Sequence, residues 1–247
     1  MYQMRNSKDH FKKKILIIGA SSYIGSNIAS YLSKKNYNVI GSYKKNKPKN
    51  IYNYKLIKLD LTSKVSISKI PKDIKIIINC ACISKKYYNN LNKIINNNIL
   101  SSYLLVNFIN KELNIEKLIF TSSMSVYGYP DTKNISKDTN IYAPTIYGSI
   151  KFLEEKIYIS NAKKYSVFCL RLPGILDNKS KYSLIPRLYK NLSKNQLIKI
   201  SNPYEKYNNI LSVFDLSKFI NILCNSKIKK FSIETFPISA INPISLI

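Results

Sequence analysis

Three side chains in the middle of the sequence could together move a proton to or from a carbinol oxygen. Tyr147 precedes Lys151 by four residues, and Ser123 ends a Thr-Ser-Ser run upstream of them. Residues four apart share one face of a helix, so the Lys151 ammonium could lower the pKa of the Tyr147 phenol. The Ser123 hydroxyl could hydrogen-bond and orient the same oxygen. These three residues are therefore the expected catalytic set of a reaction that transfers a hydride at the carbinol carbon.

The spacing of this set is weak evidence when it is taken alone. The chain contains 20 tyrosines and is rich in lysine, so a Tyr-x-x-x-Lys pair also arises by chance on a solvated helix face. The other motifs along the chain have to decide between these two interpretations.

A glycine-containing turn lies near the start of the chain. The apolar run 15–18 is typical of a strand buried on both faces, and apolar residues at helical spacing follow from Ile24. Between them, Gly19 and Gly25 would let the backbone turn tightly and approach a pyrophosphate at the helix N-terminus. Ser22 occupies a position where glycine is common in such turns, so a turn without a ligand is the alternative.

Further motifs follow in order along the chain. Asp60-Leu61 comes after the third predicted strand, and residues 79–82 (Asn-Cys-Ala-Cys) end the fourth. Asn98 leads a motif in a long helix, and the segments Arg171-Leu-Pro-Gly and Val213-Phe-Asp-Leu follow the catalytic set. Together with the glycine turn, these segments resemble the extended short-chain dehydrogenase/reductase family, the NAD-dependent epimerase/dehydratase family of nucleotide-sugar enzymes. The resemblance extends over nearly the whole chain.

The resemblance implies a nicotinamide coenzyme bound across the carboxyl ends of the strands. It implies that Asp60 contacts the adenine, that residues 80–82 lie beside the ribose and nicotinamide, and that Lys151 holds the nicotinamide ribose. The complete set of residues expected to bind the coenzyme is Gly19, Ser21, Ser22, Tyr23, Ile24, Gly25, Ser42, Lys44, Asp60, Leu61, Cys80, Ala81, Cys82, Asn98, Tyr147, Lys151 and Pro173.

The end of the second predicted strand bears on the choice of coenzyme. An acidic residue there would accept hydrogen bonds from a ribose 2′-hydroxyl and repel a 2′-phosphate. Here Ser42-Tyr-Lys44 follows without a carboxylate, and Ser42 and Lys44 could instead donate hydrogen bonds to a phosphate. We therefore expect NADP(H) in preference to NAD(H), with a solvated lysine-rich loop as the alternative.

The resemblance also narrows the reaction. Dehydratases of the family carry an acidic pair directly after the catalytic serine or threonine, whereas this chain has Met124 and Ser125. A 4,6-dehydratase is therefore not expected. The favoured function is ketoreduction of a nucleotide-diphosphate sugar for surface polysaccharide biosynthesis, with 4-epimerisation second. A non-catalytic nucleotide-binding sensor or scaffold is the alternative, although such a binder would not need the catalytic set.

The residues that would hold the substrate are less distinct. Asn208-Asn209 stands where many relatives carry an arginine that grips the diphosphate, so Arg187 or Lys206 would have to replace it. Arg171 ends a buried strand and is equally compatible with a structural and a functional role. Asp215 opens a helix and is expected to cap it.

The composition limits other classes of function. The formal net charge is +27, but the lysines are dispersed, which does not favour a specific nucleic-acid interface. Four cysteines and one histidine lack the spacing of a zinc site, so no metal is expected. No apolar run approaches the ~20 residues of a membrane span, and the run after the basic N-terminal segment is too short for a signal peptide. We expect a cytoplasmic protein with reduced thiols.

Strand and helix patterns alternate up to about residue 171, which predicts an α/β fold with a Rossmann-like, doubly wound parallel sheet. The predicted strands are 14–18, 37–42, 55–59, 74–79, 116–121 and 166–171, and the predicted helices are 23–34, 64–70, 87–112 and 145–162. We expect residues 1–173 to form the NAD(P)-binding domain and residues 174–247 a small, abbreviated substrate lobe, in which a helix at 214–224 packs back on the sheet domain. The two long helices, 87–112 and 145–162, could also form a homodimer.

Overall fold

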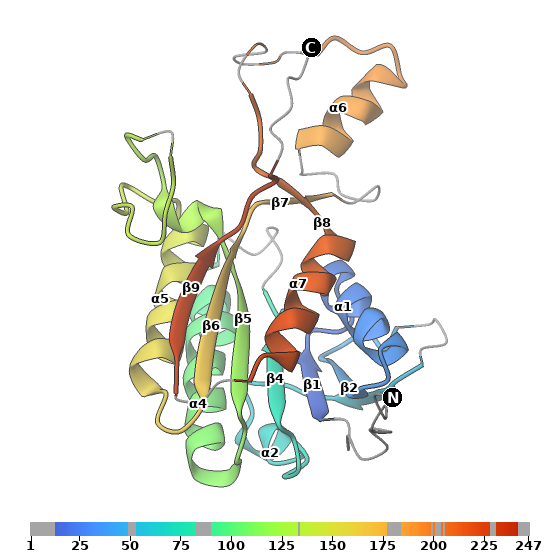
Figure 1. Cartoon of the computed structure of the whole chain (residues 1–247), viewed down its shortest axis with the longest axis vertical. Coiled ribbons are helices and arrows are strands. Elements are labelled where there is room, and N and C mark those ends of the chain that lie inside the picture. The colour runs from blue at the N-terminus through green and yellow to red at the C-terminus, as the bar shows by residue number, and fades with distance from the viewer. Residues whose placement is uncertain are drawn as a thin grey trace, which may run out of the picture.

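The computed structural model describes residues 13–48, 53–82, 90–132, 134–176, 184–198, 200, 204, 206–227 and 231–241. Its centre is a seven-stranded parallel sheet with the order β3-β2-β1-β4-β5-β6-β9 (Figure 1). The strands are β1 (Lys14–Ile18), β2 (Asn38–Tyr43), β3 (Lys55–Lys58), β4 (Ile76–Asn79), β5 (Lys117–Ser123), β6 (Ser166–Leu172) and β9 (Ile233–Pro237). The strand order reverses direction between β1 and β4, so the predicted doubly wound, Rossmann-like fold is confirmed.

Helices cover both faces of this sheet. They are α1 (Tyr23–Lys34), α2 (Lys64–Ile67), α4 (Ser101–Glu112), α5 (Ile146–Asn161) and α7 (Val213–Asn225). Leu16 and Ile18 of β1 belong to the core under α4 and α5, whereas Ile15 and Ile17 belong to the core under α1 and α7. Successive residues of a strand point to opposite faces, so one short apolar run supplies two hydrophobic cores.

The predicted helix 87–112 is divided into three parts. α3 (Leu91–Ile94) is followed by the π-helix η2 (Ile95–Leu100) and then by α4. Residues 83–89 lie outside the described residues, so the predicted start at 87 is untested. Asn98, in the π-helix, is buried with 1% of its surface exposed. Such π-helical insertions occur frequently at functional sites.

The chain after β6 departs from the prediction. A second, two-stranded sheet pairs β7 (Gly174–Leu176) with β8 (Ile210–Ser212), and it lies with α6 (Leu184–Leu192) beyond the carboxyl ends of the large sheet (Figure 1). We expected all of 228–247 in this lobe, but β9 pairs with β6 as the edge strand of the main sheet. Helix α6 is also absent from the predicted elements, which between residue 171 and the helix at 214–224 include neither a strand nor a helix.

Helix α7 packs back on the sheet domain, as predicted for 214–224. The Phe214 ring lies 5.7 Å from that of Tyr31 on α1, edge to face. Its N-terminal cap is Ser212, whose hydroxyl oxygen accepts from the Asp215 backbone N–H at 3.0 Å. Asp215 therefore lies inside the first turn and does not cap the helix; its carboxylate accepts from the Ser212 hydroxyl and pairs with Lys218.

Candidate active site

A cavity of about 650 Å³ opens at the carboxyl ends of β1, β2 and β4. Ten of the residues expected to bind the coenzyme line it: Gly19, Ser21, Ser22, Ser42, Lys44, Asp60, Leu61, Cys80, Ala81 and Cys82. Residues that the sequence did not single out also line it, among them Lys45, Lys47, Lys93, Asn97 and Ser101. Asn97 and Ser101 lie on either side of Asn98, so the helical segment that contains Asn98 borders the cavity through these two neighbours.

The turn after β1 brings two backbone segments into close contact. Gly19 has φ +80°, a conformation that favours glycine. A Cβ atom on Gly25 would lie 2.3 Å from the Gly19 carbonyl oxygen, so a side chain there does not fit. The turn thereby keeps the N-terminus of α1 open toward the cavity, as a pyrophosphate requires. This cradle fits the phosphates of a dinucleotide.

Ser22 has a local role that explains why it can replace glycine. Its φ is −83°, so the position does not need glycine's freedom, and its side chain is the N-cap of α1. The Ser22 hydroxyl accepts from the Gly25 N–H at 3.1 Å and donates to the Gly19 carbonyl at 2.8 Å. The serine therefore stabilises the turn that the glycine pattern predicted.

The end of β2 is connected to the strand beside it and to η2. The Lys44 ammonium lies 2.9 Å from the Asp60 carboxylate and donates to the Asn97 side-chain oxygen at 2.8 Å. Desolvation opposes the ionised form of Asp60, but hydrogen bonds from Lys44 and Thr62 prevail and lower its pKa. The Ser42 hydroxyl oxygen accepts from the Gly19 N–H at 3.3 Å. Ser42 and Lys44, the two residues expected to bind a 2′-phosphate, thus both line the cavity.

The catalytic set meets where β5 ends and α5 begins. Tyr147 is in the first turn of α5, which Thr145 caps. A Cβ on Gly148 would lie 2.0 Å from the Ser125 carbonyl oxygen, so this glycine lets α5 approach the turn that follows Ser123. Ser123 and Lys151 both lower the pKa of the Tyr147 phenol, which also lies close to the thiol of Cys82, a residue that lines the cavity. The structure therefore brings the hydroxyl and the phenol together at the cavity edge.

The pKa of Tyr147 corrects one expectation. Burial raises this pKa above its ordinary value, and the effect outweighs the lowering by Lys151 and by Ser123. The Lys151 ammonium acts in the expected direction, but it is paired with Glu154, whose carboxylate acts in the opposite direction. Tyr147 therefore keeps its proton at neutral pH in the coenzyme-free protein.

Four other residues expected to bind the coenzyme, Asn98, Tyr23, Ile24 and Pro173, contact other parts of the protein. The Asn98 amide nitrogen donates to the Ile94 carbonyl at 3.1 Å within the helix. The Tyr23 hydroxyl donates to the Leu176 carbonyl at 3.2 Å, which joins α1 to β7. Ile24 packs on the core under α1, and Pro173 is buried between β6 and β7. None of these four is among the described residues that line the cavity.

The contacts of Arg171 indicate a structural role. Its guanidinium donates to both carboxylate oxygens of Glu155, with the closest contact at 2.8 Å, and both side chains are buried. At the position where relatives carry the diphosphate-binding arginine, the Asn209 backbone carbonyl accepts from the Gly174 N–H at 3.2 Å. Of the two residues expected to replace that arginine, Lys206 is exposed. The Arg187 side chain lies outside the described residues. Within the described part, no three metal-ligating side chains cluster, and no helix is long and apolar enough to cross a membrane.

The chain is similar to known proteins. Residues 15–228 match the model of the NAD dependent epimerase/dehydratase family. A UDP-glucose 4-epimerase of Lactobacillus helveticus is 30% identical over 162 residues, which cover 58% of this chain and 46% of that enzyme. A UDP-glucose 4-epimerase of Mycoplasma genitalium is 28% identical over 246 residues, which cover 87% of this chain and 70% of that enzyme. The match to the first enzyme thus spans less than half of its length.

The fold has solved counterparts as well. The UDP-glucuronic acid 4-epimerase from Bacillus cereus, solved in complex with NAD, superposes with a TM-score of 0.79 at 20% identity, over 94% of this chain and 79% of that one. At this identity the likeness establishes the fold alone. The family model, in contrast, spans the glycine turn, the cavity residues and all three members of the catalytic set. The chain belongs to the NAD-dependent epimerase/dehydratase family.

Proposed function

We propose that this protein binds a nicotinamide dinucleotide in the cavity and uses Ser123, Tyr147 and Lys151 to act on a nucleotide-diphosphate sugar. The observation that carries the proposal is that Ser123 and Lys151 both lie close enough to the Tyr147 phenol to lower its pKa, beside a cavity that begins at the Gly19 turn. The names of the relatives, which are UDP-glucose 4-epimerases, support a UDP-sugar as the class of substrate.

Ketoreduction is the first reaction that we propose, with 4-epimerisation second. When bound, the nicotinamide ring supplies or accepts the hydride. Ser123 orients the substrate oxygen, and Tyr147 exchanges a proton with it. Because burial raises the pKa of Tyr147, its hydroxyl carries a proton at neutral pH, and reduction requires such a proton for the carbonyl oxygen. The relatives' names favour epimerisation, in which the same tyrosine would also have to accept a proton.

NADP(H) is the coenzyme that we propose, although the related structure from Bacillus cereus contains NAD. The end of β2 carries no carboxylate, and Lys44, Lys45 and Lys47 line the adjacent part of the cavity. Ammonium groups there would favour a 2′-phosphate. The proposal also includes the remaining expectations: a substrate lobe around α6, a homodimer through the helical segments 87–112 and 145–162, a cytoplasmic location and a role in surface polysaccharide biosynthesis.

Two measurements test the function. Fluorescence titration with NADPH and NADH should show binding, and no binding of either at millimolar concentrations would contradict the proposal. Keto-sugar nucleotides are then profiled with NADPH consumption as the readout. If the coenzyme binds but no candidate sugar is turned over, the evidence would favour the alternative, a non-catalytic nucleotide-binding sensor.

Replacing the phenol tests the catalytic assignment. Tyr147→Phe removes only the proton-transferring hydroxyl, so turnover should fall ~10²–10⁴-fold while coenzyme affinity changes little. Lys151→Ala should weaken both. Ser149→Ala, on an exposed position of the same helix turn, is the matched control and should retain the parent's turnover. A Tyr147→Phe protein with the parent's rate would refute the assignment.

A further inference from the structure

The ammonium of Lys151 is enclosed in the protein and faces a second buried charge. Its Nζ donates to the Thr121 carbonyl at 3.2 Å and lies 3.4 Å from Oε2 of Glu154. Both side chains are only 2% exposed. The Nζ also lies 4.4 Å from the centre of the Phe120 ring, whose face attracts a cation but carries no net negative charge. A charge buried in this way persists only if an opposite charge compensates it, and Glu154 supplies that charge.

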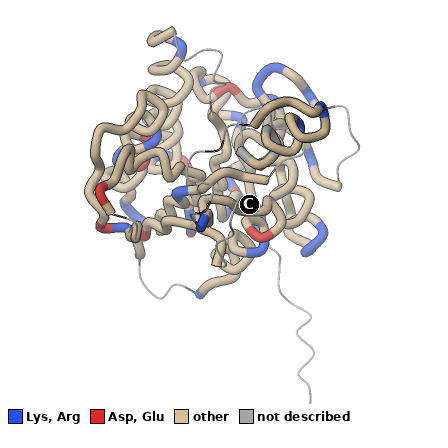
Figure 2. Tube along the Cα trace, turned by 90° about the horizontal axis from the view of Figure 1, so that it is seen from above, with Lys and Arg blue, Asp and Glu red and all other residues tan. Residues whose placement is uncertain are grey.

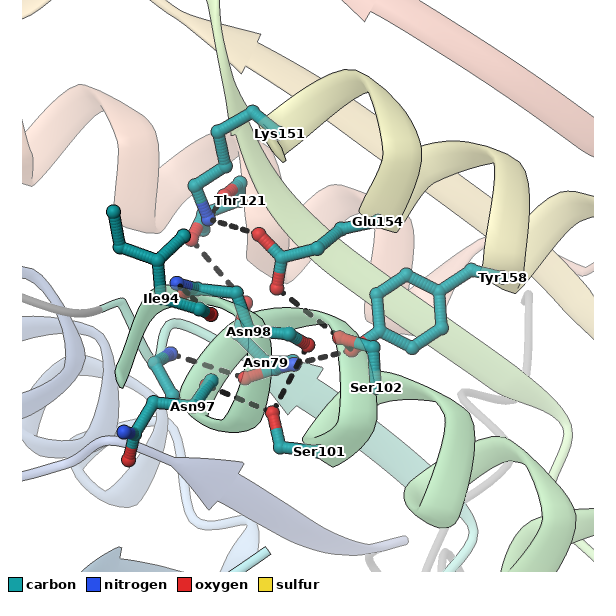
Figure 3. Close-up of polar contacts among 11 residues, drawn as sticks. Asn79, Ile94, Asn97, Asn98, Ser101, Ser102, Thr121, Lys151, Glu154 and Tyr158 are labelled. Atoms are coloured by element: carbon teal, nitrogen blue, oxygen red, sulfur yellow. Dashed lines mark hydrogen bonds and ion pairs between the residues drawn. The ribbon is translucent and has the colours of Figure 1, made fainter. Parts of the chain in front are cut away.

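The other carboxylate oxygen of Glu154 begins a chain of hydrogen bonds that leads to the cavity (Figure 3). Oε1 accepts from the Ser102 hydroxyl at 3.1 Å, and the Ser102 oxygen accepts from the Tyr158 hydroxyl at 2.8 Å. The Tyr158 oxygen in turn accepts from the Asn79 amide nitrogen at 2.7 Å. Asn79 Oδ1 accepts from the N–H of Ala81, a residue that lines the cavity. Glu154 thus connects the catalytic lysine to the turn after β4.

We propose that Glu154 is the positioning residue of Lys151, which keeps the ammonium protonated and fixes it between β5 and the turn after β4. The role of Lys151 toward a coenzyme rests on the proposed function, whereas the charge pair does not. The Lys151 pKa, which burial lowers and the Glu154 carboxylate raises, is above its ordinary value. Burial raises the pKa of Glu154 as well, and the Lys151 ammonium and the Ser102 hydroxyl oppose this by stabilising the carboxylate.

The groups around the pair do not compete with it near neutral pH. Desolvation raises the pKa values of the surrounding phenols and thiols, so these groups stay neutral until alkaline pH: Tyr147 and Tyr158 on α5, Cys80 and Cys82 after β4, and Cys169 on β6. The remaining charged groups, Glu155 and Arg171, are paired with each other. Lys151 and Glu154 are therefore a self-contained pair among the described residues.

The first test needs no ligand and compares thermal unfolding across pH. In Glu154→Gln, Lys151 has no counter-charge, so burial lowers its pKa below the unfolded value of about 10.4. A group with a lowered folded pKa contributes stability above its unfolded pKa and loses it as pH falls through the folded pKa. The Tm deficit of Glu154→Gln relative to the parent should therefore narrow between about pH 7 and about pH 10, by roughly 3 °C per unit of lowered pKa.

Two further variants separate this effect from a general loss of stability. The double variant Glu154→Gln/Lys151→Met lacks the titrating ammonium and should lose the pH-dependent part of the deficit. Glu155→Gln is the matched control, because the adjacent and equally buried Glu155 pairs with Arg171, which does not titrate in this range. Its Tm deficit should be independent of pH.

The second test uses NADH and NADPH as probes. Between about pH 7 and about pH 9.5, the dissociation constant for the coenzyme should rise about tenfold more in Glu154→Gln than in the parent. The reason is that Lys151 loses its proton in this range only in the variant. In Lys151→Met, coenzyme binding should be weak, and adding Glu154→Gln should not change it further. If the parent binds neither coenzyme, the proposed function fails, and the unfolding test still decides the role of Glu154.

Three results would overturn the inference. One is a Tm deficit of Glu154→Gln that is as independent of pH as that of Glu155→Gln. Another is a pH-dependent deficit that persists when Lys151 is methionine. The third is a Glu154→Gln protein that folds neither near neutral pH nor at about pH 10. The inference requires folding at about pH 10, where Lys151 is neutral in this variant.

Discussion

Ser42 is the residue through which the coenzyme preference can be tested. Its side chain is 2% exposed, lines the cavity, and accepts from the Gly19 N–H. A carboxylate in its place would repel a 2′-phosphate and accept from a ribose hydroxyl. Ser42→Asp should therefore lower the affinity for NADPH relative to NADH by about tenfold, or ~1.4 kcal/mol, in fluorescence titrations. Ser42→Ala is the uncharged control, and an unchanged affinity ratio in Ser42→Asp would show that the 2′-phosphate does not bind here.

Single residues were predictable where their chemistry is local. The glycine turn and the approach of Tyr147 to Ser123 follow from motif order, because the carboxyl ends of parallel strands meet at one edge of a sheet. The charge state of Tyr147 was not predictable, because it depends on burial and on Glu154. That carboxylate lies three residues after Lys151 on a helix whose exposure the sequence could not establish.

At the scale of elements, the role of the junction between β1 and α1 can be tested by substituting Gly25. A Cβ on Gly25 would lie 2.3 Å from a backbone oxygen, which cannot move without opening the turn. Gly25→Ala should cost about 2 kcal/mol or more in chemical denaturation and abolish measurable coenzyme binding. Ser26→Ala, one position further along α1, removes only a hydrogen bond to Tyr23 and should cost about 1 kcal/mol. Equal binding by both variants would show that the turn does not hold the phosphates.

Elements were predictable where hydrophobic periodicity is strong. The helix α1 was placed at its observed bounds, and α2 was predicted three residues too long. The apolar residues around Asn98 have the spacing of an ordinary helix, so the sequence did not reveal the π-helix η2. The strand β9 is short and partly exposed, and its membership in the sheet depends on pairing with β6, which no local pattern reveals.

For the whole molecule, the net charge of +27 predicts how the protein binds polyanions such as DNA. Figure 2 shows lysine and arginine on many separate segments of the trace, as their dispersal in the sequence predicted. Attraction to DNA should therefore be weak, independent of base sequence, and lost steeply with salt. In a gel shift we expect complexes at low salt and none at physiological ionic strength. A complex that survives physiological salt with one sequence and not with others would contradict this expectation.

The pairing of β9 with β6 also affects how the protein is made. The Ser232 N–H donates to the Ser166 hydroxyl oxygen across 66 residues of sequence, so β6 is synthesised long before its outer neighbour. At ~5–20 residues per second, the ribosome needs roughly 3 to 13 s to deliver that neighbour. During this interval β6, all of whose residues are buried in the finished protein, is an unpaired apolar edge on the nascent chain. Such an edge can pair with another nascent chain, so chaperone supply and translation speed should govern the yield of soluble protein.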